Sequence, residues 1–333
     1  MPLRKIEVTI PADAQSVYEK LVEDESILHV WHDRSSEEGD FLVTILIDAG
    51  QAEELLDKAE QLLSSYEGFR LLMMPVEATL PRIEKEEKEP EEEEPLEKKL
   101  QGLRVSREEL YSKISEGISM NRIYLLMVVL STIVAALGIL RDNTAVVIGA
   151  MVIAPLLGPN VGLALSTALA DFKLGIESLK SNFSGLAVAL FISVVLGYFM
   201  TVDSSAYQIA SRTEVHLSDI SLALASGAAG VLAYTVGMSA AVIGVMVAVA
   251  LLPPLVTAGL LLGDMQYELS VMAFLLLLTN VICVNLAAVG TFILQGVRPR
   301  NWFEAEKAKR ANRIALVIWV VLVLILAAII YYA

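Results

Sequence analysis

Two apolar stretches of the sequence combine prolines with nearby polar residues, a pattern that can present oxygen atoms to a cation. AVVIGAMVIAPLLGP (145–159) runs directly into Asn160, and AAVIGVMVAVALLPP (240–254) is followed three positions later by Thr257. Proline has no N–H and crowds the carbonyl four residues before it, so a helix that contains proline loses a hydrogen bond there. Freed carbonyls attract cations, while the start of a new half-helix attracts anionic groups. The sequence therefore predicts two broken helices that form a site for an ion or small solute.

The predicted site combines the two breaks with two asparagines of a later apolar segment. Its residues are Met151, Pro155, Gly158, Pro159, Asn160, Val249, Ala250, Pro253, Pro254, Thr257, Asn280 and Asn285. A packing kink is the alternative for each break, because proline is commoner in membrane helices than in soluble ones. Likewise, an asparagine inside a membrane helix often only bonds a neighbouring helix.

The two proline-containing stretches are copies of each other at a constant offset of 95 residues. They match at 9 of 15 positions, including Gly149 with Gly244 and Pro159 with Pro254. The same offset carries the first apolar segment onto the fourth, so each copy holds three spans. Because three is odd, the second copy must enter the membrane from the opposite side. We therefore expect an inverted repeat whose two breaks lie at the same depth and face one shared polar site.

The composition places most of the chain in a membrane, since 55% of its residues are hydrophobic and the mean hydropathy is +0.60. The predicted fold is an α-helical polytopic membrane protein of seven spans, a 3+3 inverted repeat plus one extra helix. The spans are 123–140, 144–170, 183–202, 217–236, 239–263, 270–296 and 314–332. The repeat domain covers 122–297, with copies at about 123–202 and 217–296, and the last helix covers 314–333.

The N-terminal residues differ in character from the rest of the chain. Residues 1–80 alternate short strand-like and helix-like segments in the order βαββαβ, which predicts a small α+β domain of the ferredoxin-like type. Residues 81–105 form an acidic linker without an apolar face. An amphipathic helix over 106–121 follows, opened by a capping box of Ser106 and Glu109. It either couples the first domain to the spans or is a plain connector.

The charge distribution predicts the orientation in the membrane. Residues 1–99 carry 26 acidic and 11 basic residues, a net charge of −15. The segment 298–313 is basic and amphipathic, with six cationic residues: Arg298, Arg300, Lys307, Lys309, Arg310 and Arg313. Short basic segments stay in the cytoplasm. The loop 171–182, with Lys173 and Lys180, is expected on the same side. This places the N-terminal domain in the cytoplasm and the C-terminus outside, and the first residues have no apolar core of signal-peptide length.

Several functions are not expected from this sequence. With one cysteine, Cys283, the chain forms no internal disulfide and no thiolate zinc site. No phosphate-binding, nucleophile-elbow or metalloprotease motif occurs, so we expect no enzyme, cofactor or metal. Expected partners are the lipid bilayer, an ion or small solute and further copies of the chain, but no nucleic acid. Paired small residues, Ala145 with Gly149 and Ala240 with Gly244, favour close helix packing.

The stretch VVIGAMVIAPLLGP resembles the prokaryotic membrane-protein family known as domain of unknown function 389. The residues that carry the resemblance are Gly149, Ala150, Met151, Ala154, Pro155, Gly158 and Pro159. The resemblance extends over roughly 105–296 and implies a polytopic membrane protein, without catalytic or binding residues to transfer. The first hypothesis, which rests on the paired breaks, is a transporter or channel with a regulatory cytoplasmic domain. The alternative is a membrane sensor or scaffold that transports nothing.

Overall fold

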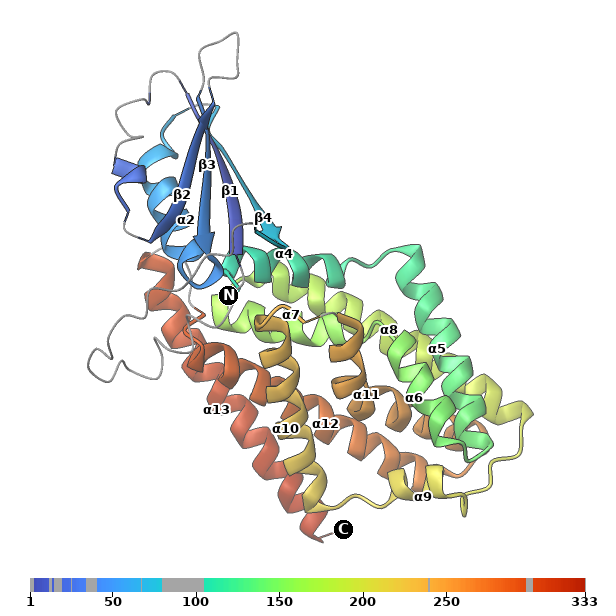
Figure 1. Ribbon diagram of the computed structural model, residues 1–333. Coiled ribbons are helices and arrows are strands. Elements are labelled where there is room, and N and C mark those ends of the chain that lie inside the picture. The colour runs from blue at the N-terminus through green and yellow to red at the C-terminus, as the bar shows by residue number, and fades with distance from the viewer. Residues whose placement is uncertain are drawn as a thin grey trace. The chain divides into compact units, whose positions relative to one another are not determined.

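The computed structural model divides the chain into two compact units, Met1–Glu109 and Leu110–Ala333, which are considered separately below (Figure 1). It describes residues 3–11, 14, 20–24, 26–33, 41–66, 68–79, 105–238, 240–297 and 302–332. Apart from its last residue, the predicted acidic linker 81–105 lies outside the described residues.

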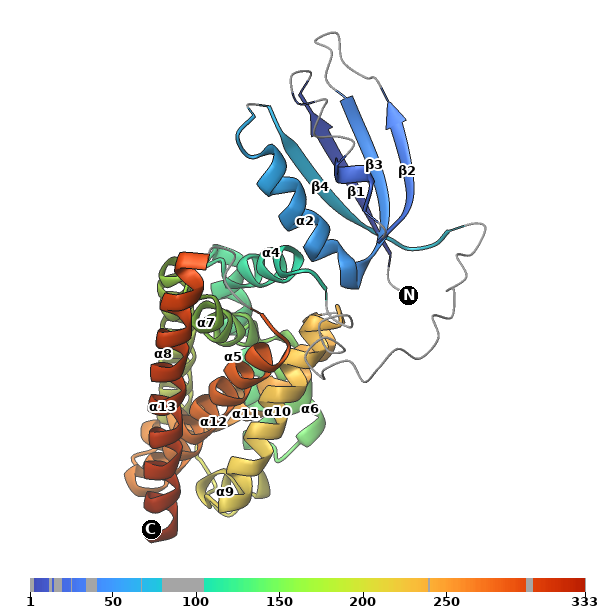
Figure 2. The same ribbon diagram turned by 90° about the vertical axis from the view of Figure 1, so that its left-hand side faces the viewer.

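The first unit contains a four-stranded antiparallel sheet with the strand order β2-β3-β1-β4 (Figure 2). Its elements are β1 (Leu3–Ile10), β2 (Ile27–Asp33), β3 (Phe41–Asp48), α2 (Ala49–Leu63) and β4 (Arg70–Val76). The four strands and the second helix confirm the sequence prediction for this region. The predicted first helix, between β1 and β2, is described as helical only at residues 20–22.

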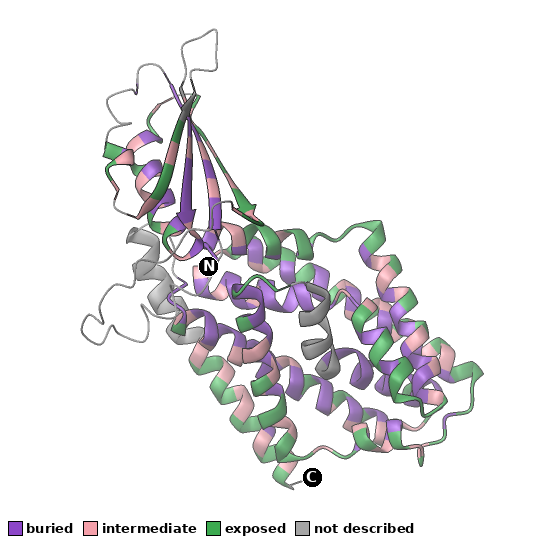
Figure 3. Cartoon of the chain, in the orientation of Figure 1, coloured by how far each residue is buried: buried purple, intermediate pink, exposed green. Residues whose placement is uncertain are grey.

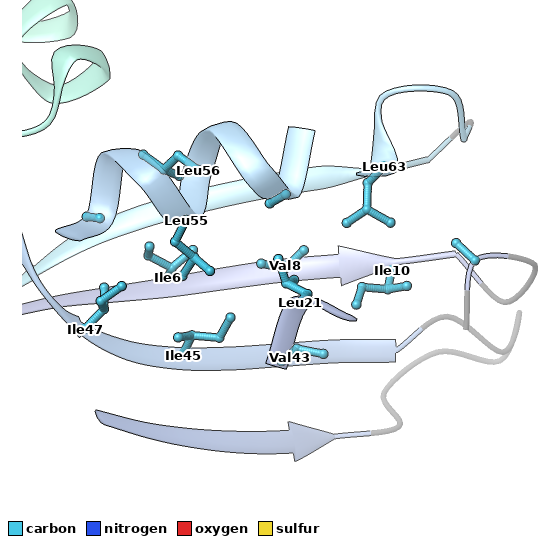
Figure 4. Close-up of a cluster of buried hydrophobic side chains, with 13 residues drawn as sticks. Ile6, Val8, Ile10, Leu21, Val43, Ile45, Ile47, Leu55, Leu56 and Leu63 are labelled. Atoms are coloured by element: carbon cyan, nitrogen blue, oxygen red, sulfur yellow. The ribbon is translucent and has the colours of Figure 1, made fainter. Parts of the chain in front are cut away.

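Alternation along the strands builds the core of this unit against α2. Every second side chain of β1 and β3 points to the same face of the sheet and meets the apolar stripe of α2 (Figure 4). These residues are Ile6, Val8, Ile10, Val43, Ile45, Ile47, Leu55, Leu56 and Leu63. Asp48 fixes the start of α2, because its carboxylate accepts a hydrogen bond from the backbone N–H of Gly50.

The second unit is helical. Its helices are α5 (Arg122–Leu140), α6 (Thr144–Ile153), α7 (Leu157–Leu169), α8 (Phe172–Phe199), α9 (Tyr207–Thr213), α10 (Leu217–Thr235), α11 (Ala240–Gly263), α12 (Tyr267–Leu294) and α13 (Trp302–Tyr332). Polar side chains set several starts: Asn121, Asn143 and Asp171 each accept a backbone N–H three residues ahead, at α5, α6 and α8. The predicted amphipathic helix is α4 (Arg107–Ile118), whose first three residues belong to the first unit.

The 95-residue offset reappears in the helix boundaries. Helix α5 runs from 122 to 140 and α10 from 217 to 235, while α8 runs from 172 to 199 and α12 from 267 to 294. Adding 95 to the bounds of α5 and α8 gives the bounds of α10 and α12. The left-handed residues between the helices match as well: Asp142 after α5 corresponds to Gly237 after α10, and Ala170 after α7 corresponds to Met265 after α11. In Figure 1, α5 runs from the end of the bundle near α4 toward the end near α9, and α10 runs the opposite way.

Four helices of the described chain are long and apolar enough to cross a membrane, or five if the bent pair of α6 and α7 is one span. Large apolar side chains face outward: Phe172, Phe183, Phe191 and Phe199 of α8 are all more than two-thirds exposed. Helix α13 is exposed or partly exposed along most of its described side chains (Figure 3). Outward apolar surface of this extent marks contact with lipid or protein. These features are compatible with a membrane protein.

One predicted boundary is wrong. The segment 171–182 is not a loop, because α8 begins at Phe172 and includes both Lys173 and Lys180. With 28 residues, α8 is about 42 Å long, longer than the roughly 30 Å hydrocarbon core, so its first turns can stay in the interface. The predicted segments 298–313 and 314–333 share one helix in their described part, α13 from Trp302 to Tyr332, whose apolar part is Leu316–Tyr331.

Candidate functional site

The first predicted break is present. Helix α6 ends at Ile153, α7 begins at Leu157, and the two are bent by 54°. Ala154 has an extended backbone, as steric crowding by the following Pro155 favours. Since Pro155 has no N–H, it cannot bond the carbonyl of Met151. Pro159 occupies the first turn of α7, where a helix needs no donor.

The second predicted break is absent, so the prediction of two matching breaks is wrong. Helix α11 continues from Ala240 to Gly263 through both Pro253 and Pro254, which are buried. The prolines still deprive the carbonyls of Val249 and Ala250 of their usual donors. Packing of α11 against α8 and α12 holds the helix together despite that loss.

Close packing between α8 and α11 supports the continuous helix of the second copy. Gly259 and Gly263 of α11 lie against α8, and Gly197 of α8 lies against the backbone of Leu260. A Cβ at any of these glycines would collide with the facing helix. The predicted pair Ala145 and Gly149 is instead exposed, so in this chain it does not pack.

Three buried asparagines from three helices meet just after the first break. The side-chain oxygen of Asn160 on α7 accepts a hydrogen bond from Asn182 Nδ2 of α8 at 3.0 Å and another from Asn285 Nδ2 of α12 at 3.2 Å. Asn160 Nδ2 donates to the carbonyl of Leu156 in the break at 2.9 Å. The three side chains are 2%, 7% and 1% exposed, respectively. We call Asn160, Asn182 and Asn285 the asparagine triad.

The triad leaves hydrogen-bonding capacity unused. Asn182 Oδ1 and Asn285 Oδ1 are buried and accept no hydrogen bond from the described residues. A buried acceptor without a donor costs about 1–3 kcal/mol. Such a cost is expected where a bound species supplies the missing partner.

The surroundings of the triad are electrically neutral. From residue 110 onward, no described Asp, Glu, Lys, Arg or His side chain is buried, and the buried polar groups are the neutral ones of Ser, Thr, Asn, Gln, Tyr and Cys. No described group of three or more His, Cys, Asp or Glu could hold a metal ion. The site therefore offers amide dipoles rather than formal charge.

The triad belongs to one copy of the repeat more than to the other. Adding 95 to positions 160 and 182 gives Leu255 and Leu277, and subtracting 95 from 285 gives Leu190. Each asparagine thus corresponds to a leucine of similar size. The prediction of one polar site shared equally by two breaks is replaced by an asymmetric site next to a single break.

The other predicted residues lie outside the triad's hydrogen bonds. Thr257 is fully buried on α11, and its hydroxyl has no hydrogen-bond partner among the described residues. Asn280 is buried on α12. The backbone at Val249 and Ala250 is helical.

Helix α4 packs on the start of α7. A Cβ on Gly158 would lie 2.5 Å from the carbonyl oxygen of Gly117, so only glycine allows this approach. The carbonyl of Ile118 accepts a hydrogen bond from Ser181 Oγ of α8 at 2.6 Å. Tyr111 donates its hydroxyl to Asp171, and burial together with this carboxylate raises the pKa of Tyr111. Gly158 of the predicted site therefore serves helix contact.

Asn182 was missing from the predicted site because the third span was expected to start at 183. The signal was present in the helical period. Leu174, Ser178, Ser181 and Asn182 are buried, whereas Lys173, Glu177 and Lys180 are exposed, so small and polar residues mark the inner face.

The apolar helices, their outward phenylalanines and the buried neutral triad fit the class of helical membrane proteins. The family described as "Domain of unknown function (DUF389)" matches residues 151–286, which include the break and the whole triad. The uncharacterized protein MJ0678 of Methanocaldococcus jannaschii is 34% identical over 332 residues, covering 100% of both chains. The chain therefore belongs to the DUF389 family. No solved structure matches it.

Proposed function

We propose that this protein is a membrane transporter or channel that moves an ion or small solute past the asparagine triad. One observation carries the proposal: beside a broken helix, two buried amide oxygens receive no hydrogen bond from the described part of the chain. Polar groups inside a membrane are costly and are usually kept for function. Helix breaks of this kind form the binding sites of many transporters.

The proposed arrangement has seven spans and an inverted repeat. Five spans are long and apolar enough in their described part: α5, α6–α7, α8, α10 and α12. We add α11 and α13, whose described apolar parts are shorter, to reach seven. Three spans per copy invert the second copy, and the opposite directions of α5 and α10 support this arrangement.

The proposed orientation places the N-terminal unit in the cytoplasm and the C-terminus outside. The support is the basic segment 298–313 together with Lys173 and Lys180, which are exposed near the start of α8. The N-terminal unit is proposed to regulate transport. Because Ala145 and Gly149 are exposed on α6, they offer a small-residue surface on which further copies of the chain can pack.

The alternative is a sensor or scaffold without transport, and the continuity of α11 favours it. Without a matching break in α11, the triad serves as an interhelical clamp. In either case we propose no enzymatic step, cofactor or nucleic-acid partner.

Flux measurement separates the two functions. Purified protein in proteoliposomes is screened for uptake of ions and small solutes, with protein-free vesicles as the blank. A transporter gives uptake that Asn160→Leu abolishes and Thr279→Val leaves unchanged, because Thr279 on α12 is equally buried but donates only to the carbonyl of Leu275. Absence of flux for every solute in folded protein would favour the scaffold.

A further inference from the structure

We propose that the asparagine triad binds a dehydrated monovalent cation, held by neutral oxygen atoms. The inference deepens the proposed function by naming the class of ligand, and it rests on that function for the role of the site. It begins with the arrangement of donors and acceptors among three side chains.

Two amide nitrogens of the triad donate to the side-chain oxygen of the third asparagine, which leaves two amide oxygens for a ligand. Asn160 Oδ1 receives the amide groups of both Asn182 and Asn285, so its two lone pairs are occupied. Asn285 Nδ2 also donates to the carbonyl of Val281 at 2.8 Å, so both of its protons are used. Each free oxygen, Asn182 Oδ1 and Asn285 Oδ1, belongs to an amide whose nitrogen bonds Asn160. The two free oxygens therefore belong to amides that converge on one atom.

A species that completes this site must present positive charge or protons to oxygen. An anion is excluded, since the unpartnered atoms of these asparagines are acceptors and no buried cationic side chain lies among the described residues from 110 onward. Carbonyl and amide oxygens replace the hydration shell of alkali cations in channels and transporters.

The neutral surroundings decide the charge of the cation. Divalent cations such as calcium and magnesium are held by carboxylates, which balance their charge. No buried carboxylate lies among the described residues from 110 onward. An uncompensated double charge inside a membrane is much less stable than a single one. The site is therefore suited to sodium or potassium.

The helix break supplies further oxygen close to the triad along the chain. Pro155 withholds an N–H group from the carbonyl of Met151, nine residues before Asn160. Asn160 is tied to the break through its bond to Leu156. A cation at the triad would thus be linked to the bend between α6 and α7.

The experiment measures the thermal stability of the purified full chain in detergent at constant ionic strength. Sodium, potassium and N-methylglucamine chlorides are compared, because a ligand that binds the folded state raises Tm in a saturable way. We expect a rise with sodium or potassium over N-methylglucamine. Radioactive sodium and rubidium measure binding directly, with one cation expected per chain.

Variants assign the response to the triad. Asn182→Leu and Asn285→Leu, which install the residue type of the other copy, should abolish the rise in Tm and the bound radioactivity. Thr279→Val should retain both. If the leucine variants do not fold, Asn182→Ser and Asn285→Ser replace them, because serine lacks the amide oxygen Oδ1 but remains polar.

Each outcome has a defined meaning. No cation response in the wild-type chain, or an undiminished response in both substituted chains, overturns the inference and leaves water as the occupant. Cation binding without any flux keeps the inference and rejects transport. Flux of an uncharged solute without cation binding keeps transport and rejects the cation.

Discussion

Asn285 Nδ2 donates a hydrogen bond to Asn160 Oδ1 at 3.2 Å, although the two residues are 125 positions apart and lie on opposite copies of the repeat. This bond joins α12 to the first turns of α7, directly after the break. The residues around this bond determine how a substitution there should change stability and transport.

Asn160→Leu should destabilise the protein and stop transport. Leucine fills the same space but leaves Asn182 and Asn285 without their acceptor, at about 1–3 kcal/mol for each buried donor. Thermal unfolding in detergent measures the loss, and Thr279→Val is the control. Equal stability of Asn160→Leu and wild type would show that the bonds contribute nothing.

Pro155→Ala and Pro254→Ala should differ in effect. Alanine at 155 supplies the missing N–H, so α6 and α7 can form a more nearly continuous helix, and flux should fall. At 254 the helix is already continuous, so alanine restores a donor for Ala250 and should stabilise by up to about 3 kcal/mol with flux retained. Flux and Tm of both variants are compared with wild type. If Pro254→Ala alone abolished flux, the function would belong to the second copy.

Gly158→Ala should loosen α4 from α7. The added Cβ would stand 2.5 Å from the carbonyl oxygen of Gly117, and relieving such a clash costs about 1–3 kcal/mol. Hydrogen exchange should then increase in 110–118. Gly149→Ala, where nothing lies within 4 Å of the new Cβ, is the matched control and should leave that exchange unchanged.

The N-terminal unit should fold alone, and better as 1–109 than as 1–80. Arg4 Nε and Nη2 donate to the two carboxylate oxygens of Glu109 at 2.8 and 3.1 Å. The shorter fragment lacks this paired contact and should be less stable by about 2 kcal/mol. Urea unfolding followed by the fluorescence of Trp31, the one tryptophan of both fragments, provides the measurement. Non-cooperative unfolding of 1–109 would contradict the unit boundary.

The stability of the 1–109 fragment should fall in acid through Asp24. A hydrogen bond from Lys58, at 2.8 Å, and another from Ser26 lower the pKa of Asp24 below its ordinary 3.8. The unfolded chain therefore takes up the proton first. The stabilisation is complete above the ordinary value and is lost as pH falls through the folded pKa. Asp24→Asn should therefore weaken the decrease of the urea midpoint between about pH 5 and pH 2. Glu23→Gln, a substitution at an exposed neighbour, is the control and should leave that decrease unchanged.

Local patterns were sufficient to predict part of this fold. Strand alternation located β1 and β3, and hydropathy located α5 and α10 to within a residue. The start of α8 was missed because Lys173 and Lys180 look like loop residues, although both are exposed on a helix. The sequence around Pro155 and Pro253 predicts a helix break at both, but only Pro155 lies in a break. At Pro253 the helix continues because α11 packs against α8 and α12. The partnership of Asn160 with Asn182 and Asn285 depends on tertiary contacts that no local pattern contains.

The matching helix boundaries imply that the repeat tolerates replacement of residues better than change of length. The left-handed residues Asp142 and Gly237 stand at equivalent places, as do Ala170 and Met265, although their side chains differ completely. One inserted residue would turn the following helix by about 100° and carry its inner face toward lipid. Within the helices of both copies, insertions and deletions should therefore be tolerated less than substitutions. Substitution at equivalent positions changes the side chain without turning the helix, as where Asn160 and Asn182 stand opposite Leu255 and Leu277, and Leu190 opposite Asn285.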